Sequence, residues 1–207
     1  TSVTTLTDRT LFPAEVENLR SSQGLVAHEL AHQWFGDLVT CKDWSQIWLN
    51  EGFATYYSAL YELHKSGRDE FLHDMLGNLN AFINVPVGEG TRPVVWREYN
   101  QDSDMFRPSY HVYNKSAWIL HMLKNQIGEA NFRRGVRLYL ERHQFGSVVT
   151  HDLIKVMEEV SGKSLDRFFD QWLFRGHHPE LEVSYSWDEQ AMLGKITARQ
   201  KQAVSKE

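Results

Sequence analysis

The sequence predicts a mainly helical chain with a short extended segment at its start and a β-hairpin near its end. Apolar residues recur at helical spacing over most of the chain. Glycines follow several of these runs and separate the predicted helices. After Pro179 the pattern changes to an alternation of apolar and polar residues, which is typical of strands.

The N-terminal part predicts one strand and one helix. Residues Thr1–Phe12 alternate weakly between polar and apolar side chains, so we expect an edge strand that ends at Pro13. A helix follows, because Ser21-Ser22 offers an N-cap and apolar residues continue at helical spacing to Trp34. Gly36 marks its end.

Further helices and one long loop follow. The helices are predicted at Trp44–His64, Asp69–Phe82, Ser109–Ile127, Ala130–Arg142, His151–Val160 and Leu165–Phe174. Residues 84–108 are rich in proline and glycine and predict a loop of unusual length, which in a compact domain usually has a function. The run Leu181–Trp187 and the run Met192–Ala198 predict a hairpin. An isolated hairpin is marginal, so we expect it to begin a further β module.

Composition excludes several classes of protein. A chain of 207 residues with 13% aromatic side chains can bury a core without cross-links. Its single cysteine, Cys41, excludes an internal disulfide framework and a cysteine-based zinc cluster. The formal charge of −5 gives no electrostatic reason to expect a nucleic acid as partner. No apolar run approaches the roughly 18 residues of a membrane span, and the oligomeric state and compartment stay open.

His28 and His32 carry the strongest chemical signal. Four residues of α-helix turn by about 400°, so both imidazoles project from one side and can reach one metal ion. Glu29 is turned by about 100° from His28, so its carboxylate flanks such a metal instead of competing for it. The alternative is a buried or solvated pair of helical histidines, but a His-Glu-x-x-His pattern within an apolar helix favours the metal.

A catalytic zinc ion needs a third protein ligand and an open fourth position. Glu51 is the candidate, because it lies on the next predicted helix and two antiparallel helices can bring such positions face to face. An acidic residue in an apolar helix also needs a partner, which a metal supplies. A surface glutamate is the alternative for Glu51 taken alone.

The stretch from Val26 to Tyr57 resembles the zinc aminopeptidases of the alanyl aminopeptidase and leukotriene hydrolase family, which are gluzincins. It contains His-Glu-Leu-Ala-His-Gln-Trp-Phe-Gly-Asp and Trp-Leu-Asn-Glu-Gly-Phe-Ala, and residues 33–50 match the family's interval between the second histidine and the glutamate. The resemblance continues through Val112–Ala117 and Asp170–Leu173. It therefore covers nearly the whole chain.

The resemblance implies a domain organisation and a substrate class. Residues 1–176 are expected to be the helical half of a thermolysin-like zinc peptidase catalytic domain, truncated at its N-terminus. Residues 177–207 are expected to begin a C-terminal β domain. The implied function is zinc-dependent removal of N-terminal residues from peptides with a free N-terminus.

The resemblance also implies a role for each site residue. One Zn²⁺ per chain is expected, bound by His28, His32 and Glu51. Glu29 is expected to be the general base that takes a proton from the attacking water, and Tyr113 to hydrogen-bond the oxyanion. Both roles agree with general chemistry, since a nearby carboxylate can accept that proton and a phenol donor can stabilise the oxyanion.

The sequence departs from the family at two places. Relatives carry a Gly-Ala-Met-Glu-Asn-like motif before the His-Glu-x-x-His helix, whose glutamate grips the substrate amine. This chain starts downstream of that motif, so amine binding is expected to lie outside these residues and the chain alone to be inactive. Seven residues after Glu51, where many relatives have a carboxylate that orients a zinc-bound histidine, this chain has Ser58. Thr55 and Glu62 lie on the same helical face and offer a compensating group.

Two other functions stay open from the sequence. The chain could be a non-catalytic helical interaction module on a peptidase scaffold, although His28, Glu29, His32 and Glu51 are all intact. The same zinc site could also serve an endopeptidase or an epoxide hydrolase. Metal content tests the first alternative, and a comparison of peptides with free and acetylated N-termini tests the endopeptidase. His111, close to Tyr113, is a further candidate for the cleft.

Overall fold

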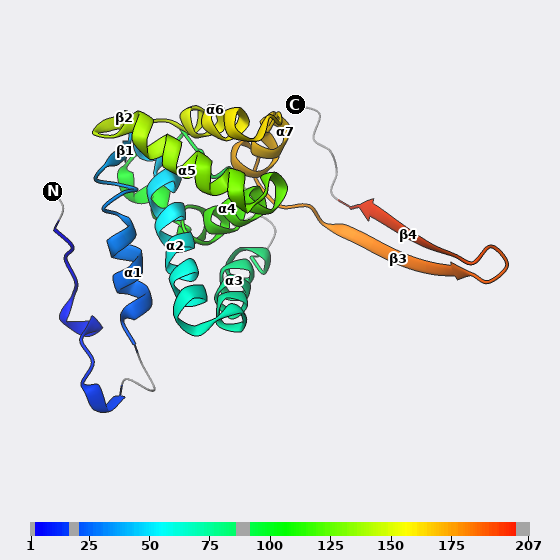
Figure 1. Cartoon of the computed structure of the whole chain (residues 1–207), viewed down its shortest axis with the longest axis horizontal. Coiled ribbons are helices and arrows are strands. Elements are labelled where there is room, and N and C mark those ends of the chain that lie inside the picture. The colour runs from blue at the N-terminus through cyan, green and yellow to red at the C-terminus, as the bar shows by residue number, and fades with distance from the viewer. Residues whose placement is uncertain (1–2, 17–20, 86–91, 202–207) are drawn as a thin grey trace. The chain divides into compact units, whose positions relative to one another are not determined.

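The computed structural model describes residues 3–16, 21–85 and 92–201. The chain divides into two compact units, Thr1–Gly176 and His177–Glu207. The first unit is built almost entirely from helices, and the second contains an antiparallel hairpin (Figure 1). The prediction of a mainly helical chain with a C-terminal hairpin is therefore confirmed. The assignment of these units to two particular domains stays a prediction.

The helical unit follows the predicted order of helices closely. The α-helices in the described part are α1 (Gln23–Ala31), α2 (Trp48–Ser66), α3 (Arg68–Ile83), α4 (Asn114–Ile127), α5 (Glu129–His143), α6 (Thr150–Ser161) and α7 (Asp166–Phe169). A π-helical turn, η6 (Asp170–Phe174), extends α7, and 3-10 turns η3 (Trp44–Gln46), η4 (Asp102–Phe106) and η5 (Ser109–His111) lie in the connections. No helix in the described ranges is both long enough and apolar enough to cross a membrane.

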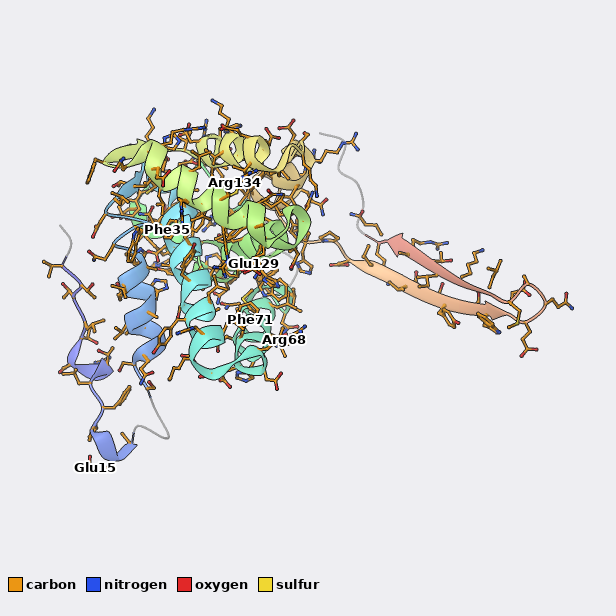
Figure 2. All side chains as sticks on the ribbon, in the orientation of Figure 1. Glu15, Phe35, Arg68, Phe71, Glu129 and Arg134 are labelled. Atoms are coloured by element: carbon orange, nitrogen blue, oxygen red, sulfur yellow. The ribbon has the colours of Figure 1, made fainter. Side chains whose placement is uncertain are left out.

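Helix α2 lies at the centre of the helical unit and packs against α1, α3 and α4 (Figure 1). Its large side chains Trp48, Phe53 and Tyr56 are completely buried. The ring of Phe35, labelled in Figure 2, stacks on Phe53 with the ring centroids 4.2 Å apart. This aromatic packing fixes the loop that follows α1 against the body of α2.

Helices α2 and α4 approach most closely at Gly52. A Cβ atom at this position would lie 2.5 Å from Cβ of Ser116 on α4, closer than two carbon atoms can approach. The glycine is therefore required by the packing and not by its backbone angles. Its position directly after Glu51 means that the close approach also sets where the start of α4 lies relative to that carboxylate.

A short parallel pair of strands, β1 (Val39–Cys41) and β2 (Gly146–Val148), joins segments that are distant in the sequence. Next to it, Trp48 Nε1 donates to Thr150 Oγ1 at 2.8 Å, and the Thr150 backbone N–H donates to Gln46 Oε1 at 2.8 Å. These groups are buried and satisfy one another, so the start of α2 is tied to the start of α6.

The prediction of an N-terminal strand is wrong in detail. The described residues 3–16 contain two 3-10 turns, η1 (Asp8–Thr10) and η2 (Ala14–Val16), and no strand. The backbone is extended at Thr7 and Leu11, as the alternation suggested. A strand also needs a partner for its backbone hydrogen bonds, and none of the described strands pairs with this segment.

The second unit contains strands β3 (Leu181–Asp188) and β4 (Leu193–Gln200), which pair antiparallel with Tyr185 opposite Ile196. Alternation places apolar side chains, among them Val183 and Tyr185, on one face. All residues of both strands are exposed within this unit.

Candidate metal centre

Three predicted ligands meet between α1 and α2. His28 and His32 lie on the face of α1 that packs against the first turns of α2, where Glu51 is located. His28 Nε2 lies 3.2 Å from Glu51 Oε2, and His32 Nε2 lies 3.3 Å from the same oxygen. The two Nε2 atoms are 3.2 Å apart. The three ligand atoms therefore form a nearly equilateral triangle.

This triangle fits a zinc ion. A tetrahedral ion with bonds of about 2.0–2.1 Å places its ligand atoms about 3.3 Å apart, which is the spacing found here. Two neutral imidazoles and one carboxylate also form a donor set that zinc binds in catalytic sites. The three side chains are 15%, 23% and 14% exposed for His28, His32 and Glu51, so a bound ion remains accessible from one side.

The ring of His32 is held in the orientation that a ligand needs. Its Nδ1 lies 3.0 Å from the backbone carbonyl oxygen of Phe35. Because a carbonyl only accepts, Nδ1 carries the proton and donates, which leaves the Nε2 lone pair free to face the other ligands. The chain turn after α1 thus selects the tautomer of His32.

The charge of Glu51 follows from the same contacts. Burial alone raises the pKa of Glu51, but the hydrogen bonds with His28 and His32 outweigh it and bring the pKa to about 2. Burial lowers the pKa of His32, but its hydrogen bonds to Glu51 and to the Phe35 carbonyl raise it above the ordinary value. Glu51 is therefore an ionised carboxylate at any physiological pH, as a metal ligand must be.

The three ligand residues line a pocket of about 700 Å³. Glu29, the predicted general base, lines the same pocket from α1. It does not belong to the triangle, as expected from its rotation about the helix axis. Glu29 therefore lies beside the three predicted ligands without being one of them.

Tyr113 lies at the same pocket, directly before α4. Its ring stacks near that of His28, with the centroids 6.0 Å apart and an angle of 29° between the planes. Burial raises the pKa of the Tyr113 phenol, and the charge of Glu51 and a hydrogen bond with that carboxylate raise it further. The phenol therefore stays protonated at neutral pH and can act as a donor.

Ser58 does not take over the task of the carboxylate found in relatives. Its hydroxyl donates to the backbone carbonyl of Gly24 at 2.7 Å and so ties α2 to the start of α1. Thr55 lines the pocket, but its buried hydroxyl has no hydrogen-bond partner within the described residues. Glu62 does not line the pocket. His111, which was predicted separately as a candidate for the cleft, is buried at η5 and does not line the pocket.

Sequence reasoning missed one wall of the pocket. Asp74 and Asn78 on α3 and Asn114 on α4 line it opposite the histidines. The predicted helix Asp69–Phe82 was interpreted only through its apolar positions. Positions 74 and 78 lie one turn apart on its polar face, and this spacing was the available signal.

Comparison with known proteins identifies the class. A model of the "Peptidase family M1 domain" matches residues 1–172, so the chain belongs to this metallopeptidase family. It is similar to the leucyl aminopeptidase of Saccharolobus solfataricus, with 37% identity over 168 residues, which cover 78% of this chain and 21% of that protein. The chain spans about a fifth of the length of the curated relatives it matches.

Solved structures agree with this assignment. The Legionella pneumophila aminopeptidase A, in complex with aspartic acid, superposes with a TM-score of 0.71 and 26% identity, covering 86% of this chain and 19% of that one. The M1 zinc metallopeptidase from Deinococcus radiodurans gives a TM-score of 0.62 and 27% identity, covering 76% of this chain and 34% of that one. The family and these structures indicate zinc as the metal.

Proposed function

We propose that this chain is the zinc-binding part of an aminopeptidase that hydrolyses the N-terminal peptide bond of peptides with a free N-terminus. The observation that carries the proposal is the triangle of His28, His32 and Glu51, whose ligand atoms are spaced for one zinc ion. The names of the relatives support the choice of substrate, since the leucyl aminopeptidase and aminopeptidase A are both exopeptidases by name.

When bound, zinc acidifies a water molecule and polarises the scissile carbonyl. The protein's own residues do the rest. His28, His32 and Glu51 hold the ion on one side and leave the pocket side open. Phe35 fixes the tautomer of His32 through its carbonyl. The Glu29 carboxylate accepts the proton of the attacking water at its oxygen and passes it to the nitrogen of the departing amine.

Tyr113 supplies the other electrostatic contribution. Its phenol points to the same pocket and is held next to Glu51 and His28. Donation from this hydroxyl to the carbonyl oxygen strengthens as that oxygen gains negative charge, which is the interaction that lowers a barrier. Loss of one such donor costs on the order of 3 kcal/mol in the transition state.

The first test measures metal. The 207-residue chain is dialysed against excess zinc and then against buffer, and its zinc content is determined by elemental analysis. One zinc per chain is expected, and the variant His32→Ala should retain much less. A chain without zinc after this treatment would contradict the proposed site and would favour the non-catalytic interaction module.

The second test measures turnover in the longest natural protein that carries this segment. Glu29→Gln should keep zinc and lose most hydrolysis of aminoacyl amides, and Tyr113→Phe should slow turnover at unchanged zinc content. Peptides with free N-termini should be cleaved and their acetylated counterparts should not. Cleavage of both forms at similar rates would identify an endopeptidase, and parental turnover in Glu29→Gln would contradict the proposed base.

A further inference from the structure

The wall that α3 and the start of α4 contribute to the pocket is polar, and hydrogen bonds fix part of it. Asn114 Nδ2 donates to Asn78 Oδ1 at 2.7 Å, and Asn78 Nδ2 donates to the backbone carbonyl of Asp74 at 3.1 Å. Both ends of the Asn78 amide are therefore engaged. The amide holds α3 and the start of α4 in register and leaves the side chain of Asp74 on the same face, one turn earlier.

The Asp74 carboxylate lies within 4.8 Å of a ring nitrogen of His73 but forms no ion pair with it. Within the described part of the chain it makes no ion pair or hydrogen bond, and the neighbouring His73 pairs with Glu70 at 3.9 Å. Burial raises the pKa of Asp74, and the charges of Glu62 and Glu70 raise it further, while the neighbouring His73 lowers it without reversing the shift. A cation that approaches a half-buried carboxylate among like charges stabilises its ionised form.

The charges around the pocket leave this carboxylate uncompensated. Among the described residues, the pocket is lined by the carboxylates of Glu29, Glu51 and Asp74 and by no lysine or arginine, and the only basic side chain at the α3 wall is the imidazole of His73. A divalent zinc ion balances the two carboxylates at its own end of the pocket. The negative charge at the α3 wall remains, and a bound molecule has to match it.

We propose that Asp74 is a specificity-determining residue that binds the cationic side chain of a lysine or arginine next to the scissile bond of the peptide. This inference rests on the proposed function, because it assigns a substrate preference to the same zinc site. The pocket volume of about 700 Å³ accommodates the zinc-binding group together with one long side chain. Asp74, the one carboxylate among the described lining residues that the metal does not balance, would place the cation.

The test uses pairs of ligands that differ in one charge. Lysine hydroxamate and norleucine hydroxamate carry the side chain before the zinc-binding group, and malonyl hydroxamates of lysine amide and norleucine amide carry it after. Affinities for the zinc-loaded chain are measured by calorimetry. In one of the two pairs the lysine ligand should bind about tenfold more tightly, as expected for a charged hydrogen bond at a half-exposed site.

The variant Asp74→Asn should abolish this preference while norleucine ligands bind with unchanged affinity. The matched control is Asp69→Asn, which removes the same charge from an exposed position on the same helix and should keep the preference. Equal affinity for lysine and norleucine in both pairs would overturn the inference, as would a preference that survives in Asp74→Asn. Zinc-loaded chain that binds neither norleucine ligand would instead contradict the proposed function.

A second measurement does not depend on the metal. The carboxyl carbon of Asp74 is observed by NMR while metal-free chain is titrated with N-acetyl-lysine methylamide or with N-acetyl-norleucine methylamide. Only the lysine compound should shift this resonance, and the Asp69 resonance should respond to neither. If the Asp74 resonance does not distinguish the two compounds, the inference is wrong whatever the hydroxamates show.

Discussion

The buried ring of His111 makes the stability of this protein depend on pH. The side chain is 1% exposed, and neither ring nitrogen has a hydrogen-bond partner within the described residues. Burial lowers the pKa of His111, and the positive charges of Arg92 and Lys115 lower it further, to about 3. The burial of Lys115 likewise lowers its own pKa to about 8. The surroundings therefore disfavour any additional positive charge.

The sign and size of the effect follow from linkage. The unfolded chain titrates this histidine near pH 6.5, whereas the folded chain does so only near pH 3. Above pH 6.5 the ring is neutral in both states and has no effect on the pH dependence. Below that pH the unfolded chain binds a proton at this histidine and the folded chain does not. The free energy of unfolding therefore falls by up to about 1.4 kcal/mol for each pH unit that the pH is lowered.

Between pH 7 and pH 5 this one group should remove about 2 kcal/mol from the free energy of unfolding. The figure hardly depends on the folded pKa as long as that pKa lies well below 5. Urea unfolding at both pH values measures it, as the difference between the parental chain and His111→Gln, which does not titrate.

The comparison is a difference of differences, so other titrating groups cancel. A lower absolute stability of His111→Gln does not affect it. If the parental chain and His111→Gln lose the same free energy between pH 7 and pH 5, the ring is protonated in the folded protein and the reasoning from burial is refuted.

Three further predictions concern the junction of the helices. Gly52→Ala should lower the free energy of unfolding by about 1–3 kcal/mol, because its Cβ would lie 2.5 Å from Ser116 Cβ. Adding Ser116→Gly should recover part of the loss. If urea unfolding shows that the effects of the two substitutions simply add, the clash is contradicted. Glu51→Gln should weaken zinc binding by at least tenfold in a competition with a chelator, since a neutral amide replaces the charged ligand, and unchanged affinity would remove Glu51 from the site. Ser58→Ala should cost about 1 kcal/mol of stability through its lost bond to Gly24 and leave zinc affinity within a factor of about three; a large loss of affinity would show that Ser58 orients a ligand after all.

The meeting of the three proposed zinc ligands could be predicted because it depends largely on local geometry. Two histidines four residues apart project from one side of any α-helix, and the connection of residues 32–47 lets α2 pack back on α1. The boundaries of α2, α3 and α5 agree with the prediction to within a few residues for the same reason. Helical periodicity depends on residues that are close in the sequence, so it can be detected from a single sequence.

The parts that escaped prediction depend on partners distant in the sequence. Strands β1 and β2 have three residues each and pair with one another across a long stretch of sequence, so neither is long enough to show an alternation of its own. The N-terminal segment shows an alternation, but no described strand pairs with it, and it forms 3-10 turns. The spacing of Asp74 and Asn78 shows that they share the polar face of α3, but whether this face lines the pocket depends on how α3 packs against α2 and α4.

The serine at position 58 illustrates how the structure changes the interpretation of a departure from the family. From the sequence, it removed a carboxylate that orients a ligand histidine. In the structure, the ring of His32 is oriented by the Phe35 carbonyl, which no side-chain substitution can remove. Ser58 instead donates a hydrogen bond to the backbone carbonyl of Gly24 and so links α2 to α1 there. The contact lies on the same helix pair as the bond between His28 and Glu51 and holds that pair in register. The serine at position 58 thus provides a hydrogen bond between the two helices that carry the proposed ligands.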